Sequence, residues 1–240
     1  MSNRIHPGTC YALISLLLTV SSITSVIAQD TVSDVDDKYR NINENYKNPD
    51  VDVWVQRFEG EGRQAYDYRN QLVEAIGLVE GQVVADVGAG TGLFEPLLAA
   101  RVGNSGSVYA VDIVPEFIEH IQKKSREHGL KNIHTVLSDE RSTRLKENSV
   151  DVVYICDAYH HFVYYKDMLK SIHDALKPGG QLFMVEFDKI PGQSSQWLID
   201  HIRGTKEEFT AEITASGFVL GEEIHIEGLN DTFVIRFYKN

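Results

Sequence analysis

The sequence predicts an α/β protein whose core is a doubly wound, mostly parallel sheet of seven strands that ends in an antiparallel hairpin. Three observations lead to this prediction. Up to residue 187, short β-branched runs alternate with segments of helical apolar spacing; a glycine-rich turn follows the first run; and no helical segment separates the last two strands. Such alternation favours a parallel sheet with a ligand site at the carboxyl ends of its strands.

The elements can be placed in order along the chain. Strands are expected at 83–87, 107–112, 132–137, 150–156, 181–187, 217–220 and 233–238, and helices at 64–76, 94–101, 115–121, 168–176 and 206–215. Pro115 suits the first turn of its helix, and Gly77 suits the end of the first one. Because the two final strands follow one another without a helix, they suit a hairpin whose last strand is antiparallel.

The turn after the first strand contains three glycines, Gly88, Gly90 and Gly92, separated by single residues. Glycine lets the backbone pass close to a ligand, and the helix that follows presents free N–H groups at its start. The dinucleotide-binding pattern Gly-x-Gly-x-x-Gly requires a third glycine where this chain has Leu93. Asp86, two residues before the first glycine, suits a cationic or amine-bearing ligand.

Further carboxylates lie at the ends of the next strands. Asp112 closes the second strand, where a carboxylate can accept hydrogen bonds from two ribose hydroxyls. Dinucleotide enzymes also place an acid there, and a helix N-cap is the alternative role for Asp112. Asp139 and Asp157 follow the third and fourth strands.

Two of these motifs resemble a known family. The glycine turn with Asp86 resembles motif I of the class I S-adenosylmethionine-dependent methyltransferases. The turn Lys177-Pro178-Gly179-Gly180 resembles the one before the fifth strand of many small-molecule methyltransferases. The resemblance covers roughly residues 56–240. It implies a Rossmann-like fold and S-adenosyl-L-methionine as the cofactor.

The resemblance also implies which residues contact the cofactor. In the family an acid after the third strand accepts from the adenine amino group, and Asp139 matches that position. The carboxylate of Asp112 suits the ribose, and Asp157 is a candidate for positioning the methionine moiety. The full expected set is Asp86, Gly88, Ala89, Gly90, Gly92, Asp112, Ile113, Asp139 and Asp157. The chain departs from the family after Asp139, because residues 140–144 are more polar than the usual continuation.

His160 and His161 follow the fourth strand, where the methyl acceptor is expected. Methyl transfer to a hydroxyl or thiol needs a base, and a neutral imidazole is suitable. Both histidines are therefore candidate catalytic residues, with a purely structural role as the alternative. A metal site is not expected, because no further His, Cys or carboxylate stands at local ligand spacing.

The sequence favours an enzyme that methylates a small-molecule or lipid-like acceptor. Two alternatives remain: an NAD-linked oxidoreductase, which the missing third glycine opposes, and a non-catalytic S-adenosylmethionine-binding protein. The formal net charge of −12 repels phosphate backbones and argues against nucleic acid as a partner. No feature of the sequence predicts the oligomeric state.

Three parts are expected along the chain. Residues 1–28 contain an uncharged run from residue 10 and indicate a cleavable signal peptide, with a membrane anchor at 10–28 as the alternative. Residues 29–55 are expected to be a polar linker or loosely docked arm, and residues 56–240 a methyltransferase domain that does not span a membrane. Trp54 and Phe58 are expected to pack onto this domain, or else to form a lid over the acceptor. Export to the periplasm or the medium contrasts with the cytoplasmic synthesis of the cofactor.

Overall fold

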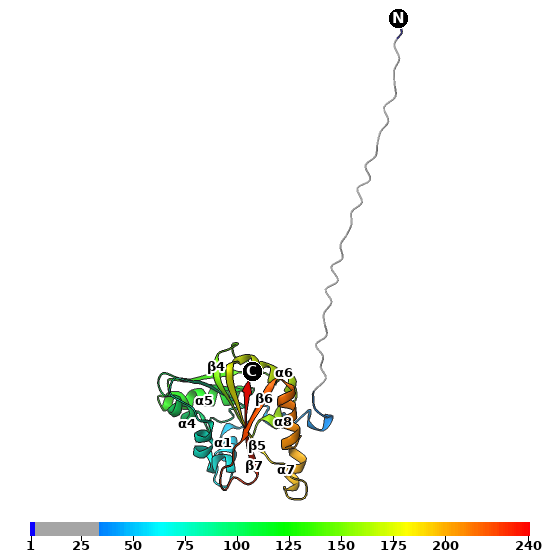
Figure 1. Cartoon of the computed structure of the whole chain (residues 1–240). Helices are drawn as coiled ribbons and strands as arrows, with labels where there is room; N and C mark the ends of the chain where they lie inside the picture. The colour runs from blue at the N-terminus through cyan, green and yellow to red at the C-terminus, as the bar shows by residue number, and fades with distance from the viewer. Residues whose placement is uncertain (3–33) are drawn as a thin grey trace. The chain divides into compact units, whose positions relative to one another are not determined.

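The structure is a computed structural model that describes residues 1–2 and 34–240 (Figure 1). The expected signal peptide or anchor at residues 1–28 lies outside the described residues, apart from the first two. In the described part of the chain, no helix combines the length and apolar character needed to cross a membrane. One compact unit comprises Ser33–Asn240.

The described residues form a seven-stranded sheet in the order β3-β2-β1-β4-β5-β7-β6. Its strands are β1 (Val83–Val87), β2 (Ser107–Asp112), β3 (Ile133–Leu137), β4 (Val150–Cys156), β5 (Leu176–Phe187), β6 (Phe218–Glu223) and β7 (Thr232–Lys239). Strands β1 to β5 pair in parallel, whereas β7 runs antiparallel to both β5 and β6. The doubly wound sheet and its C-terminal hairpin are therefore confirmed.

The helices also follow the expected order. They are α1 (Val51–Phe58), α2 (Gln64–Asp67), α3 (Arg69–Ile76), α4 (Glu95–Val102), α5 (Pro115–Glu127), α6 (Tyr165–Ala175), α7 (Gln196–His201) and α8 (Lys206–Ala215), with short 3-10 helices η1 (Asp37–Tyr39), η2 (Glu44–Tyr46) and η3 (Tyr159–His161). The single helix expected at 64–76 is divided at Tyr68, whose φ and ψ are −100° and 13°. Helices α1 and α7 were not predicted, and α1 forms where the end of the polar linker or arm was expected.

Alternate residues of the central strands face two helical layers, as the pleat of a strand requires. Val84 and Val152 pack with α3 and α4, whereas their neighbours Ala85 and Val153 pack with α6 and α8. Figure 1 shows α4 and α5 on one side of the sheet and α6 and α8 on the other. The central strands are thus covered by helices on both faces. A ligand can reach them only at the ends of the strands.

The turn at residues 177–180 is part of β5. Val150 pairs with Leu176 and Val152 with Gln181, so the Lys-Pro-Gly-Gly residues form a bulge between these two pairs. Gly179 lies at a φ of +74°, a conformation that favours glycine. Strand β5 therefore begins five residues earlier than expected from residue 181, because one pair forms before the bulge.

The segment expected to be a linker or loosely docked arm contacts the domain. The backbone N–H of Asp34 donates to the Val163 carbonyl at 2.9 Å, and the Asn43 side chain donates to the His161 carbonyl at 3.2 Å. The Trp54 ring lies 6.5 Å from the Phe117 ring, centroid to centroid. Trp54 therefore packs onto the domain, the first of the two expected arrangements.

Candidate active site

A pocket opens at the carboxyl ends of β1, β2 and β4. It encloses about 970 Å³ of space, part of which is open to solvent. Loops after the three strands supply one wall, and the N-terminal arm supplies another. Eight predicted site residues line the pocket: Asp86, Gly88, Ala89, Gly90, Asp112, Ile113, Asp157 and His161. Three predicted site residues, Gly92, Asp139 and His160, are not among its lining residues.

The glycine turn has the backbone conformation that its sequence suggests. Gly88, Gly90 and Gly92 have φ values of +87°, +55° and +81°. A Cβ on Gly88 would lie 2.4 Å from the Cβ of Ala158, so the β1 turn and the segment after β4 can approach only with glycine here. A Cβ on Gly92 would lie 2.9 Å from Ile121 of α5, which makes Gly92 a packing residue beneath the pocket.

Asp112 is buried and holds the glycine turn in place. One carboxylate oxygen accepts the Gly90 N–H at 2.8 Å, and the other accepts the Val114 N–H at 2.9 Å. Burial raises the pKa of Asp112 to about 6, and the hydrogen bonds from the backbone oppose this shift. Each oxygen keeps a lone pair for a further donor. The N-cap of α5 is Val114, so Asp112 does not occupy the cap position.

Asp86 and Asp157 each have a buried oxygen without a hydrogen-bond partner among the described residues. Burial is the largest cause that raises the pKa of Asp86 well above its usual range, followed by the charges of Glu95 and Asp112. Burial also raises the pKa of Asp157 to about 6, against the opposing charge of Arg63, whose guanidinium donates to it at 2.8 Å. Buried polar atoms are normally satisfied, so these two oxygens are placed to accept from a ligand.

The lining of the pocket is strongly acidic. Four carboxylates line it, those of Asp86, Asp112, Glu140 and Asp157, and Arg63 is the one cationic side chain of Lys or Arg among its described lining residues. This composition favours a cationic ligand over a pyrophosphate. It also fits a ligand rich in N–H and O–H donors.

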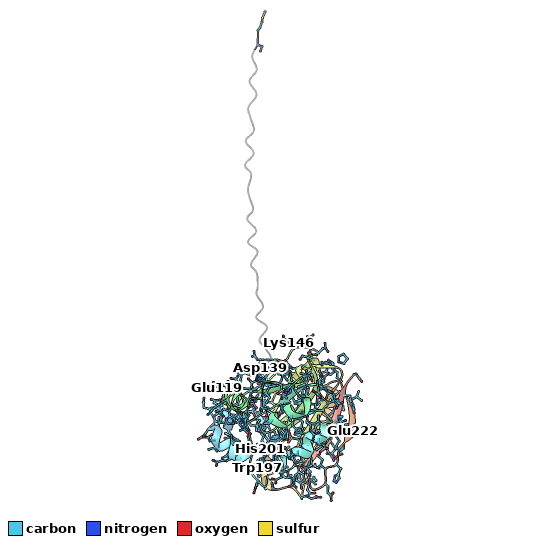
Figure 2. All side chains as sticks on the ribbon, turned by 90° about the vertical axis from the view of Figure 1, so that its left-hand side faces the viewer. Glu119, Asp139, Lys146, Trp197, His201 and Glu222 are labelled. Carbon is cyan, nitrogen blue, oxygen red and sulfur yellow. The ribbon has the colours of Figure 1, made fainter. Side chains whose placement is uncertain are left out.

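Asp139 has other partners. One of its oxygens accepts the N–H groups of Arg141 and Ser142 at 2.8 and 2.9 Å, and the other accepts from the Arg144 side chain at 2.9 Å. Its neighbours Ser138 and Glu140 line the pocket instead. Figure 2 shows Asp139 on a different part of the domain surface from His201. The adenine-binding role of Asp139 stays a prediction, and its carboxylate is already engaged within its own loop.

His160 and His161 lie on η3, directly after β4. His160 is buried, and its Nδ1 lies 2.9 Å from both oxygens of Glu186. His161 lines the pocket, with Nδ1 3.0 Å from Oδ1 of Asn43 and Nε2 3.5 Å from the Tyr46 hydroxyl. Burial lowers the pKa of both histidines well below their usual range, so both rings are neutral. Only His161 of the predicted pair is in a position to meet an acceptor.

A third histidine joins this pair. The ring of His201 on α7 lies 5.0 Å from that of His160 and 5.4 Å from that of His161. It stacks on the indole of Trp197 at 4.8 Å, and Figure 2 shows the two side chains next to one another. Sequence reasoning missed His201 because it stands forty residues further along the chain.

The aromatic wall of the pocket combines residues of the arm, of α1 and of α5. The sequence offered a lid that includes Phe58 as the second of two arrangements, but it did not place Tyr46 or Phe117 at the site. Tyr46 and Phe58 line the pocket together with Phe117 of α5. Trp54 packs behind them, 4.6 Å from the Tyr46 ring and 5.1 Å from the Phe58 ring. The only sequence signal for this wall was the occurrence of large aromatic residues in a polar segment.

Comparisons with known proteins agree with this arrangement. Residues 84–180 match a family model described as "Methyltransferase domain". Over 123 residues the chain is 29% identical to a "Ubiquinone/menaquinone biosynthesis C-methyltransferase UbiE" of Wigglesworthia glossinidia brevipalpis, which covers 51% of this chain and 49% of that protein. It is 31% identical over 129 residues to a "Protein-L-isoaspartate O-methyltransferase 2" of Archaeoglobus fulgidus, with 53% of each chain covered. This chain therefore spans about half the length of the curated relatives it matches.

The fold is shared with solved structures. A "SAM dependent methyltransferase from Aquifex aeolicus" superposes with a TM-score of 0.70 at 23% identity, over 79% of this chain and 98% of that chain. This chain and that structure share an α/β fold of the methyltransferase type. Residues 84–180 are therefore similar to the methyltransferase domain family, and the fold is that of the S-adenosylmethionine-dependent methyltransferases, a class whose cofactor is S-adenosyl-L-methionine.

Proposed function

We propose that the protein transfers a methyl group from S-adenosylmethionine to a small aromatic or lipid-like acceptor. The observation that carries the proposal is the acidic pocket, in which two buried oxygens of Asp86 and Asp157 lack a partner among the described residues. S-adenosylmethionine has a sulfonium and an ammonium group against a single carboxylate, so a net positive charge enters a pocket lined by four acidic side chains and one guanidinium group. A dinucleotide would bring a negative pyrophosphate into the same place.

The chain's own residues can hold such a cofactor at several points. Asp112 has a free lone pair on each oxygen for ribose hydroxyls, and its existing bonds to the backbone fix its orientation. Asp86 and Asp157 can accept from amine groups. When bound, S-adenosylmethionine supplies a methyl group on a good leaving group. Orientation of the two reactants can then contribute about 7–11 kcal/mol toward the barrier.

The acceptor is proposed to lie against the aromatic wall. Tyr46, Phe58, Phe117 and Phe162 line this part of the pocket, and His161 presents its ring beside them. A wall of aromatic side chains favours a planar, apolar acceptor. The UbiE relatives are named for the biosynthesis of ubiquinone and menaquinone, which makes hydroquinones the first class to test. His161 is the proposed base in this arrangement, because it lines the pocket and His160 does not.

The test begins with binding by the full-length chain. Calorimetry with S-adenosylmethionine and with NAD should give saturable binding of the first and none of the second. Transfer of labelled methyl is then measured with alkylated hydroquinones, catechols, thiols and fatty acids. Binding of NAD alone would support the oxidoreductase alternative. Binding of S-adenosylmethionine without transfer to any acceptor would support the non-catalytic alternative.

We propose separately that residues 1–28 direct the protein out of the cytoplasm, either as a cleaved signal or as an anchor. The support is the uncharged run that begins at residue 10. Sequencing the N-terminus of the protein from each cell fraction tests this. A cytoplasmic protein that retains residues 1–28 would contradict export, and would also remove the conflict with cofactor supply.

A further inference from the structure

We propose that His160, His161 and His201 bind one divalent transition-metal ion of the zinc class beside the acceptor end of the pocket. One ring nitrogen from each histidine lies within 4.8 Å of the others. With Zn–N bonds of about 2.0–2.1 Å, tetrahedral ligands stand about 3.4 Å apart. The rings therefore need to close by about 1.4 Å at most, which small side-chain rotations provide.

His160 is already oriented as a metal ligand. Metal-binding histidines usually donate their second ring N–H to a carboxylate or carbonyl, which fixes the tautomer. Here Nδ1 of His160 lies 2.9 Å from Oε1 of Glu186. The Glu186 oxygens also accept the backbone N–H groups of His160 and Phe187, at 3.1 and 2.8 Å. Glu186 thus acts as the acceptor, Nδ1 carries the proton, and the lone pair is on Nε2.

His161 has the same arrangement with a different partner. The Asn43 amide nitrogen donates to the His161 carbonyl at 3.2 Å, which directs Oδ1 of Asn43 toward Nδ1 of His161 at 3.0 Å. Nδ1 of His161 is therefore the protonated nitrogen. Its Nε2 lies 3.5 Å from the Tyr46 hydroxyl, at the limit of a hydrogen bond. A metal ion bound at Nε2 would therefore displace only a weak hydrogen bond.

His201 completes the set from another element. It is half-buried at the end of the short helix α7 and packs on Trp197, and its ring is inclined by 71° and 68° to those of His160 and His161. Rings inclined in this way can direct their nitrogens to a common point. Three histidines with a fourth open position are the ligand set of known catalytic zinc sites.

The charges around the cluster permit a cation. Glu186 places a buried carboxyl group next to His160. The two nearby guanidinium groups are already paired, Arg63 with Asp157 at 2.8 Å and Arg203 with Glu212 at 2.7 Å.

His161 lines the pocket, so an ion held by this cluster is close to the acceptor end. There it would lower the pKa of an acceptor hydroxyl or thiol, whose proton would pass to solvent, and His161 would then serve as a metal ligand in place of its role as the base. This role rests on the proposed function. Metal binding itself does not.

The test uses the full-length chain after treatment with a chelator. Zn²⁺ is titrated by calorimetry, Co²⁺ by its visible absorbance, and the metal content is measured by mass spectrometry. We expect one ion per chain. His201→Ala should weaken Zn²⁺ binding by about a hundredfold or more, and Glu186→Gln by about ten- to a hundredfold. His128→Ala removes an exposed histidine of the described chain outside the cluster and should change nothing.

Circular dichroism shows whether the variants fold, and the half-buried His201 is the substitution that disturbs the core least. Wild-type protein that fails to bind one ion per chain would overturn the proposal. A folded His201→Ala protein that binds Zn²⁺ as tightly as wild type would do the same. S-adenosylhomocysteine is titrated into the same preparations. A protein that binds S-adenosylhomocysteine but not Zn²⁺ contradicts only the metal site, and a protein that binds Zn²⁺ but not S-adenosylhomocysteine contradicts only the proposed function.

Discussion

The two sides of the pocket are built from different kinds of contact. The cofactor side is the glycine turn and Asp112, joined by a hydrogen bond between consecutive strand–turn–helix units. The acceptor side combines the arm with the segment after β4, and the bond between Asn43 and His161 joins residues 118 positions apart. The first side is therefore visible as a short motif, whereas the second exists only after folding.

Phe58 is where the two sides meet. A Cβ on Gly90 would lie 3.3 Å from the Phe58 ring. The glycine therefore admits an aromatic residue of α1 as well as a ligand. The comparison predicts that variants of the turn affect cofactor binding first, and that variants behind the aromatic wall affect only the acceptor.

The largest effect is expected from Gly90→Val. Valine has to adopt a φ of +55°, and its side chain meets Phe58 at the edge of the pocket. Binding of S-adenosylhomocysteine should weaken by about a hundredfold or more, since backbone strain and lost space act together. Calorimetry measures the affinity, and circular dichroism confirms that the protein is folded.

Gly129→Val is the matched control for this variant. Gly129 has a φ of +67°, but no heavy atom lies within 4 Å of the position that a Cβ would take, so this variant has the strain without the close approach. It should lower stability and leave the affinity unchanged. Equal affinities for the two variants would mean that the Gly90 turn has no contact with the cofactor.

The next effect concerns Asp112. Replacing it with alanine removes the acceptor proposed for the ribose, and charge-assisted hydrogen bonds contribute about 1.5–3 kcal/mol. Asp112→Ala should therefore weaken S-adenosylhomocysteine binding by about ten- to a hundredfold. Asp139→Ala is the comparison, because its carboxylate is held by its own loop. A dissociation constant that is unchanged in Asp112→Ala would remove Asp112 from the site.

Lowering the pH should weaken cofactor binding by less than the Gly90→Val substitution does. The pKa of Asp112 is raised to about 6 by burial, and the cofactor is proposed to bind its ionised form. Below pH 6 the carboxyl must lose its proton before binding, so affinity falls as pH falls. Between pH 7.5 and pH 5 the loss should be about tenfold. Titrations of Asp112→Asn at the same values should lack this component; an equal loss in that variant would assign it to other groups.

Much of the fold was predictable from local patterns. The strand runs, the glycine turn and the absence of a helix before the last strand each depend on neighbouring residues, and all appear in the structure. The predicted start of β5 at residue 181 was wrong. The strand begins at Leu176 because this residue pairs with Val150 of β4, and a contact between strands is not visible in the local sequence. The contributions of Tyr46 and Phe117 to the aromatic wall, and of His201 to the histidine cluster, were missed for the same reason. No spacing along the chain indicates that α7 or η2 lies next to η3.

The smallest effect tests the acceptor side alone. Trp54 does not line the pocket, but its ring supports those of Tyr46 and Phe58 from behind. Aromatic pairs contribute about 0.5–1.5 kcal/mol each, so Trp54→Ala should lower kcat/KM for a methylated hydroquinone by about five- to tenfold. The affinity for S-adenosylhomocysteine should stay within about twofold of wild type. The ring partners of Trp54 are Tyr46, Phe58 and Phe117, and none of them belongs to the glycine turn. Val53→Ala changes an exposed residue on the same helix and controls for effects of α1 itself. If Trp54→Ala weakened cofactor binding as much as kcat/KM, the arm would serve both sides, and the division of the pocket into a local and a long-range half would fail.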